Sequence, residues 1–137
     1  MKLQRRTYHL MNLFIETRQL IMYINRKQII DTLLRIIDHI SDKEYQERVW
    51  ILGKGPEVDD FDETCCNFFP EVDDVIEKYK DFGITTAQYK ILKKFRDKFD
   101  IFSDTNNWPQ EFIDTPEWIT IMHLAKDVLK AFNYQKN

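Results

Sequence analysis

Apolar residues recur at intervals of three and four along most of the chain, the spacing expected for one face of an α-helix. The clearest run is residues 26–40, RKQIIDTLLRIIDHI, in which Ile and Leu recur at helical spacing. Asn25 precedes this run in the position of an N-cap. An apolar face this wide predicts a central, nearly buried helix.

Two further helices are predicted on either side of this segment. The first covers residues 10–21, whose apolar residues also recur at helical spacing and could pack alongside 26–40: Leu10, Met11, Phe14, Ile15, Leu20 and Ile21. The second opens at Ser41, where Ser-x-x-Glu forms a capping box with Glu44, and it continues to Leu52. Gly53, Gly55 and Pro56 then end it, so a loop is expected next.

The C-terminal half predicts three more helical segments. One covers residues 72–79 and ends at Gly83, and a second begins at the capping box of Thr85 and Gln88. The third runs from Thr115 to Asn133 and starts with a cap, a proline and an acid: Thr115, Pro116 and Glu117. We therefore predict an all-α fold, a single-domain bundle of about five or six helices spanning residues 1–137.

Composition agrees with a packed helical domain. The chain is 43% hydrophobic and 14% aromatic, and its 3 Gly and 4 Pro supply little turn material for an all-β fold. The N-terminus begins like a signal peptide, but polar residues interrupt the apolar run and no small-residue cleavage site follows. No stretch approaches the roughly 18 apolar residues of a membrane span. We expect a cytoplasmic protein with no membrane partner.

Acidic charge is concentrated in one short segment. The net charge is −3, yet residues 55–77 carry nine acids and no base, whereas residues 1–54 sum to +4 and residues 78–137 to +2. The segment opens with GPEVDDFDETCC, in which five acids fall close together: Glu57, Asp59, Asp60, Asp62 and Glu63. Such a field attracts basic surfaces and repels nucleic acid, so we expect no nucleic-acid partner.

Several chemistries are disfavoured by the same residues. A calcium loop starting at Asp60 would have Cys65 where the sharp turn needs Gly, with Pro70 near its end. The three histidines lie on different predicted helices, and the adjacent Cys65 and Cys66 have no CxxC partner, so we expect no metal and no cofactor. No nucleophile–base constellation or phosphate-binding glycine loop is present, which argues against an enzyme. No catalytic residue is predicted.

The acidic segment is then either a docking surface for a basic protein or a solvated stretch without a partner. Phe61, Phe68 and Phe69 are expected to turn inward and hold the segment in place while its carboxylates stay in water. Trp50, Phe61 and Trp108 could anchor a partner, although core packing is the alternative for each. Carboxylates can occupy a nuclease site that normally holds phosphate.

Three stretches of the chain resemble small bacterial immunity proteins encoded beside polymorphic toxins of the contact-dependent growth inhibition and Rhs type. They are RVWILGKGPEVDDFDETCCNFF, EKYKDFGITTAQYKILKKFRDKF and EFIDTPEW, and the resemblance covers about residues 47–132. It implies a cytoplasmic, non-enzymatic protein that binds the toxin of its own system, often over a nuclease active site. It supplies no catalytic residue.

The sequence therefore predicts an antitoxin that occludes a toxin domain with a basic active-site surface. The predicted partner-binding residues are Trp50, Glu57, Asp59, Asp60, Phe61, Asp62 and Glu63. A helical adaptor or regulatory domain for another basic protein is the alternative, followed by a nucleic-acid-binding regulator. The chemistry of the toxin and the oligomeric state stay open at this point.

Overall fold

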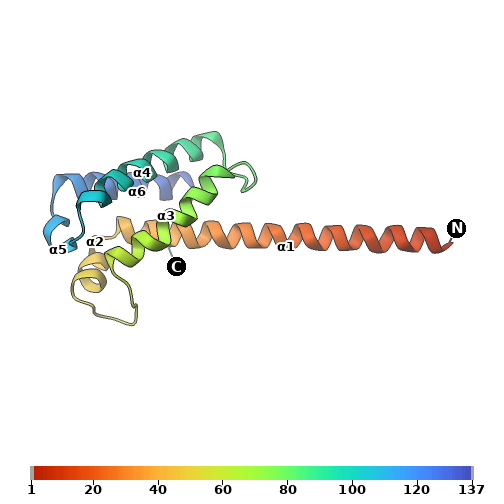
Figure 1. The fold of residues 1–137 in the computed structure, drawn as a ribbon, viewed down its shortest axis with the longest axis horizontal. Helices are drawn as coiled ribbons and strands as arrows, with labels where there is room; N and C mark the ends of the chain where they lie inside the picture. Colours follow the sequence, from red (N-terminus) through yellow and green to blue (C-terminus); the bar gives the residue numbers. More distant parts are fainter. Residues whose placement is uncertain (1, 137) are drawn as a thin grey trace.

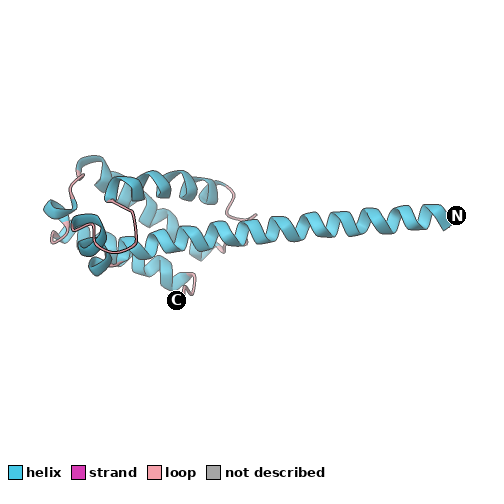
Figure 2. Cartoon of the chain, turned by 90° about the horizontal axis from the view of Figure 1, so that it is seen from below, coloured by secondary structure: helices cyan, strands magenta, loops and turns pink. Residues whose placement is uncertain are grey.

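The regular elements are all helices, as predicted (Figures 1 and 2). The computed structural model describes the backbone of residues 2–136 and the side chains of residues 13 and 16–136. Over this part of the chain the elements are α1 (Lys2–Ser41), α2 (Lys43–Tyr45), the π-helical η1 (Gln46–Ile51), α3 (Phe61–Glu77), α4 (Thr86–Thr105), α5 (Pro109–Phe112) and α6 (Pro116–Ala131).

The two helices predicted for the N-terminal region are one continuous helix, α1. Asn25 is therefore an interior residue of α1, and its prediction as an N-cap was wrong. No Gly or Pro occurs before Gly53, so nothing in the sequence stops the helix between the two apolar runs. Leu10, Met11, Phe14 and Ile15, which were expected to pack alongside residues 26–40, have side chains outside the described residues.

The first part of α1 extends away from the rest of the molecule as an arm (Figures 1 and 2). We define the arm as residues 2–25, because its described side chains, 13 and 16–25, are all exposed. Burial begins beyond it, with Leu33, Ile37 and Ile40 in the core. Within the described residues, no helix combines the length and apolarity needed to cross a bilayer.

The core lies where the C-terminal part of α1 meets α3, α4 and α6. Helix α6 packs against both α1 and α4, and α3 also contacts both of them. Trp118 of α6 is fully buried, with the rings of Phe112, Phe102 and Phe61 centred 4.7, 5.2 and 6.0 Å from its own. Aromatic residues from four elements thus form one apolar centre.

Gln46, at the start of η1, is a buried polar residue whose hydrogen-bonding groups are satisfied. Its Nε2 donates to the carbonyls of His39 and Ile40 at 3.0 and 2.9 Å, and its Oε1 accepts from Trp118 Nε1 at 2.9 Å. The carbonyls belong to the last turn of α1, which has no intrahelical donors for them. Gln46 therefore links the end of α1 to α6.

Three predicted caps can be compared with the structure. Thr85 and Gln88 form the predicted capping box of α4, and Thr115 caps α6 by accepting from Trp118 N. Ser41 is instead the last residue of α1, and Asp42 is the N-cap of α2, accepting from Tyr45 N at 3.2 Å. The prediction for Ser41 was wrong because α1 runs one residue further than its apolar pattern.

Candidate functional site

The acidic segment is partly loop and partly helix. A loop follows η1, as predicted, but α3 begins at Phe61, well ahead of the predicted segment 72–79. Asp60 is the N-cap, and its carboxylate accepts from Glu63 N at 2.7 Å, while Asp62 and Glu63 occupy the first turn. Acids in these positions are favoured by the helix dipole. We call residues 56–63 the acidic turn.

Asp59 organises the acidic turn from inside. Its Oδ2 accepts from Tyr45 Oη at 2.8 Å and from Trp50 Nε1 at 3.1 Å, and Thr64 Oγ1 lies 3.1 Å from both carboxylate oxygens. Tyr45, Trp50 and Thr64 are all buried, at 6%, 8% and 3% exposure. The Asp59 carboxylate therefore accepts hydrogen bonds from α2, η1 and α3, and its role is to hold these elements together.

Glu57 is held by an arginine of the same chain. Arg48 Nη1 donates to Glu57 Oε2 at 2.6 Å and to the Lys54 carbonyl at 3.1 Å, which closes the loop on η1. Gly55 lies against this guanidinium with a φ of +105°, and a Cβ there would collide with it. The loop thus needs glycine for its backbone conformation, and a Cβ there would push the Arg48 guanidinium aside.

Of the three aromatic residues that could anchor a partner, two are core residues. Trp50 and Phe61 are buried, with ring centroids 5.5 Å apart. The third, Trp108, is 60% exposed and lines a hollow of about 400 Å³ together with Asp60 and Asp62. Its neighbours in sequence, Asn107 and Pro109, are the signal that could have placed it at the surface, since they predict a loop.

A second hollow lies on the other side of the acidic turn, between α1 and α3. This groove has a volume of about 440 Å³ and is lined from α1 by Thr32, Arg35, Ile36 and His39. Its carboxylates are Glu57, Asp59, Glu63 and Glu71, and the exposed Val58 lies at its edge. The start of α3 therefore separates two hollows, each lined by acids.

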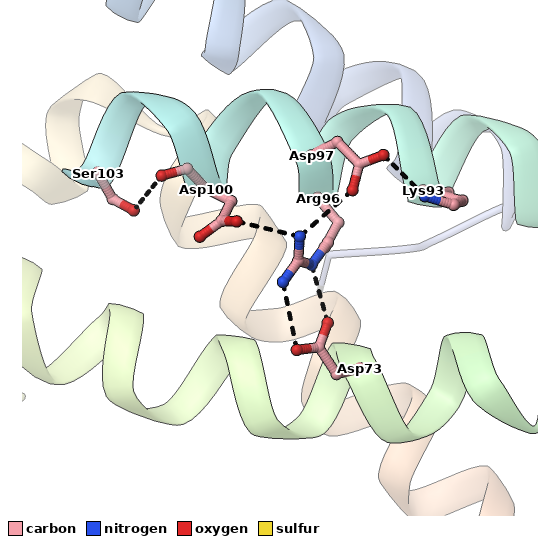
Figure 3. A network of polar contacts seen from close by, with 6 residues as sticks. All are labelled: Asp73, Lys93, Arg96, Asp97, Asp100 and Ser103. Atoms are coloured by element: carbon pink, nitrogen blue, oxygen red, sulfur yellow. Dashed lines mark hydrogen bonds and ion pairs between the residues drawn. The ribbon is translucent and has the colours of Figure 1, made fainter.

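Other acids of the segment are neutralised by bases of the same chain. Figure 3 shows Arg96 of α4 reaching Asp73 of α3, with its Nε at 2.8 Å and its Nη2 at 3.3 Å from the carboxylate. The same guanidinium contacts Asp97 and Asp100, and Lys78 pairs with Asp74. Among the side chains that the structure describes, no Lys or Arg forms an ion pair with four acids nearer the start of α3: Asp60, Asp62, Glu63 and Glu71.

His39 lies in the groove with its ring stacked on Tyr45, the centroids being 3.8 Å apart. Burial lowers the pKa of His39, outweighing Asp59 and Asp38, which raise it. Burial and the Asp59 carboxylate together raise the pKa of Tyr45, so its hydroxyl stays a donor. At neutral pH the His39 ring is therefore mainly uncharged, and the Tyr45 hydroxyl keeps its proton.

The lowered pKa of His39 predicts a loss of stability in mild acid. In the unfolded chain His39 has its ordinary pKa of about 6.5, whereas in the folded chain its pKa is lower. The uncharged form of His39 therefore makes its full contribution to the free energy of unfolding above about pH 6.5, and this contribution declines as the pH falls below that value. Chemical denaturation from pH 7.5 to 5 should show a shallower decline for His39→Gln than for the parent chain. Parallel slopes would contradict this assignment.

The remaining candidate chemistry of the chain is metal binding and thiol reactivity. The described part of the chain contains no group of three His, Cys, Asp or Glu residues placed to hold a metal ion. Burial raises the pKa of Cys65 to about 12, so its thiol stays protonated at neutral pH, whereas Cys66 is exposed. Comparisons with protein-family models, curated proteins and solved structures find no match to this chain.

Proposed function

We propose that the chain is an immunity protein that binds a toxin domain and occludes its basic active-site surface, such as that of a nuclease. The docking surface is the outer side of the acidic turn together with Trp108. The observation that carries the proposal is that Asp60 and Asp62 line the same hollow as this exposed tryptophan. The turn on which they lie is held in place by the buried hydrogen bonds of Asp59.

The chemistry of this surface suits a basic partner. Asp60 and Asp62 could pair with the lysines and arginines that hold phosphate in a nuclease, and Trp108 offers the kind of aromatic anchor that dominates many interfaces. Charge complementarity would also speed the encounter. The resemblance of residues 47–132 to immunity proteins points the same way.

The remaining predicted residues support the surface from within. Asp59 and Glu57 accept from side chains of their own fold, and Trp50 and Phe61 pack below the turn. A turn that is already ordered loses little conformational entropy when it binds, which favours affinity. We therefore assign direct contact to Asp60, Asp62 and Trp108, whereas Glu63 lies in the groove on the other side of the turn. The other four predicted residues, Trp50, Glu57, Asp59 and Phe61, have a supporting role.

Removing charge from the docking surface should weaken toxin binding. The variant Asp60→Asn/Asp62→Lys keeps a good N-cap, because Asn caps helices as well as Asp does. We expect its dissociation constant for the toxin domain encoded beside its gene to rise at least tenfold, with a slower association rate at low salt. Surface plasmon resonance measures both quantities.

Glu117→Lys provides a matched control, because Glu117 occupies the same helical position in α6 as Asp62 does in α3 and lines neither hollow. It should bind like the parent chain. Unchanged affinity of the double variant would remove the acidic turn from the interface. A neighbour-encoded protein that is harmless when expressed alone would contradict the antitoxin function itself, and salt-sensitive retention on nucleic acid would favour the regulator instead.

A further inference from the structure

Among its described side chains, the arm of α1 presents an exposed apolar face. Four aliphatic residues at helical spacing are between 44% and 59% exposed: Leu13, Leu20, Ile21 and Ile24. Thr17 falls on the same face. Isolated helices are marginal in water, and most helical stability in proteins comes from packing an apolar face. A partner that covered this face would therefore stabilise the arm.

The apolar face of the arm and the acidic groove open on the same side of α1. Thr17 and Arg35 are 18 residues apart in this continuous helix, as are Ile21 and His39. Eighteen residues make about five full turns, so each pair shares one direction around the helix axis. Arg35 and His39 both line the groove.

The apolar residues of the arm and the α1 residues of the groove also fall opposite each other when two copies of α1 run antiparallel. Turning α1 end for end about Gln28 places residues 24, 21, 20 and 17 opposite residues 32, 35, 36 and 39. The first set is the apolar face of the arm, and the second set is the α1 wall of the groove. Leu20 would then meet Ile36. A surface that maps onto itself in this way is the requirement for a twofold-symmetric contact.

Charge favours the same arrangement. Residues 2–27 carry six Lys or Arg and one Glu, a net +5, whereas the rest of the chain is −8. Two arms packed on each other would bring like charges together. An arm placed in the groove would instead approach four carboxylates and one arginine, Arg35, and two of those carboxylates, Glu63 and Glu71, have no basic partner among the described side chains.

We propose that two copies of this chain form an antiparallel dimer in which each arm lies in the acidic groove of the other copy. Gln28, which is exposed, lies at the twofold axis. The contact forms twice, once at each end of the paired helices. It leaves the hollow lined by Asp60, Asp62 and Trp108 outside the groove, so dimerisation and toxin binding can be tested separately.

A cysteine at the axis tests the register directly. In a Cys66→Ser background, Gln28→Cys should form a disulfide-linked dimer on mild oxidation, because facing residues at a twofold axis come within disulfide reach. Lys27→Cys is the control: it is also exposed, but it points about 100° away. Non-reducing gels and mass spectrometry identify the products. Equal cross-linking of both variants, or of neither, would overturn the proposed register.

Two further variants separate the two halves of the contact. Leu20→Asp/Ile21→Asp damages the arm, and Glu63→Lys/Glu71→Lys damages the groove, so each should weaken dimerisation at least tenfold in sedimentation velocity. A mixture of the two should recover part of the dimer, since the intact arm of one copy fits the intact groove of the other. Ile101→Asp, at a 70% exposed position elsewhere, should dimerise normally.

Other occupants of the arm predict different results. Pairing of arm with arm would leave the groove variant fully dimeric, which would overturn the proposal. A monomeric chain that sediments with vesicles of anionic phospholipid through its arm would also overturn it, because a basic amphipathic helix can lie on such a membrane. A monomer at all concentrations up to the millimolar range would do the same.

Discussion

Replacing Trp118 by alanine is expected to destabilise the fold more than any other single substitution considered. The side chain is fully buried and contacts rings from η1, α3, α4 and α5. Truncating a buried Trp costs about 3–5 kcal/mol, and the change also leaves the Gln46 amide oxygen without its donor. Urea denaturation monitored by circular dichroism should show a loss at the upper end of that range or an unfolded protein.

Trp108→Ala is the control for this measurement. Trp108 is 60% exposed, so its removal should change the free energy of unfolding by no more than about 0.5 kcal/mol. Trp118→Phe keeps most of the apolar volume but not the donor, and it should fall between the two. A loss below about 1 kcal/mol for Trp118→Ala would contradict the packing described here.

The second large effect is expected at Asp59, although this residue lies on the surface segment with the most acids. Asp59→Ala would leave the buried donors of Tyr45 and Trp50 without an acceptor. Each unsatisfied buried group costs about 1–3 kcal/mol, so we expect a loss of about 3 kcal/mol in the free energy of unfolding. Thermal and urea denaturation measure this directly.

Asp62→Ala is the comparison that separates burial from charge. It removes an acid three residues away that is exposed and forms no ion pair with a described side chain, so only its interaction with the helix dipole is lost and the cost should be less than about 1 kcal/mol. Asp59→Asn, which keeps one acceptor, should be intermediate. Equal losses at Asp59 and Asp62 would show that the hydrogen bonds to Asp59 carry no stability.

The fold class could be predicted because helical periodicity and capping chemistry are local properties. The caps at Thr85 and Thr115 needed only neighbouring residues to be recognised, and both are present. The continuity of α1 through Asn25 was missed because a polar residue at a cap-like position suggests a helix end, although a helix ends there only when the chain on either side turns away. Nothing in the sequence makes it turn there.

The site was harder to predict because burial depends on contacts distant in sequence. The cluster of acids was visible, but Asp59 and Asp62 look alike in sequence, and only their three-dimensional neighbours separate a structural carboxylate from an exposed one. The same holds for Trp50 and Trp108. Local pattern located the acidic turn; it could not say which of its side chains face outward.

The pairing of α1 with α6 has a consequence for how the chain is made. The first and last helices pack on each other, and Gln46 and Trp118, joined by a hydrogen bond, are 72 residues apart. During synthesis α1 leaves the ribosome long before its partner exists, and contacts between distant residues form slowly. The apolar face of α1 that α6 covers in the folded protein therefore stays exposed until translation is nearly finished. Exposed apolar surface of this kind is what chaperones bind on nascent chains.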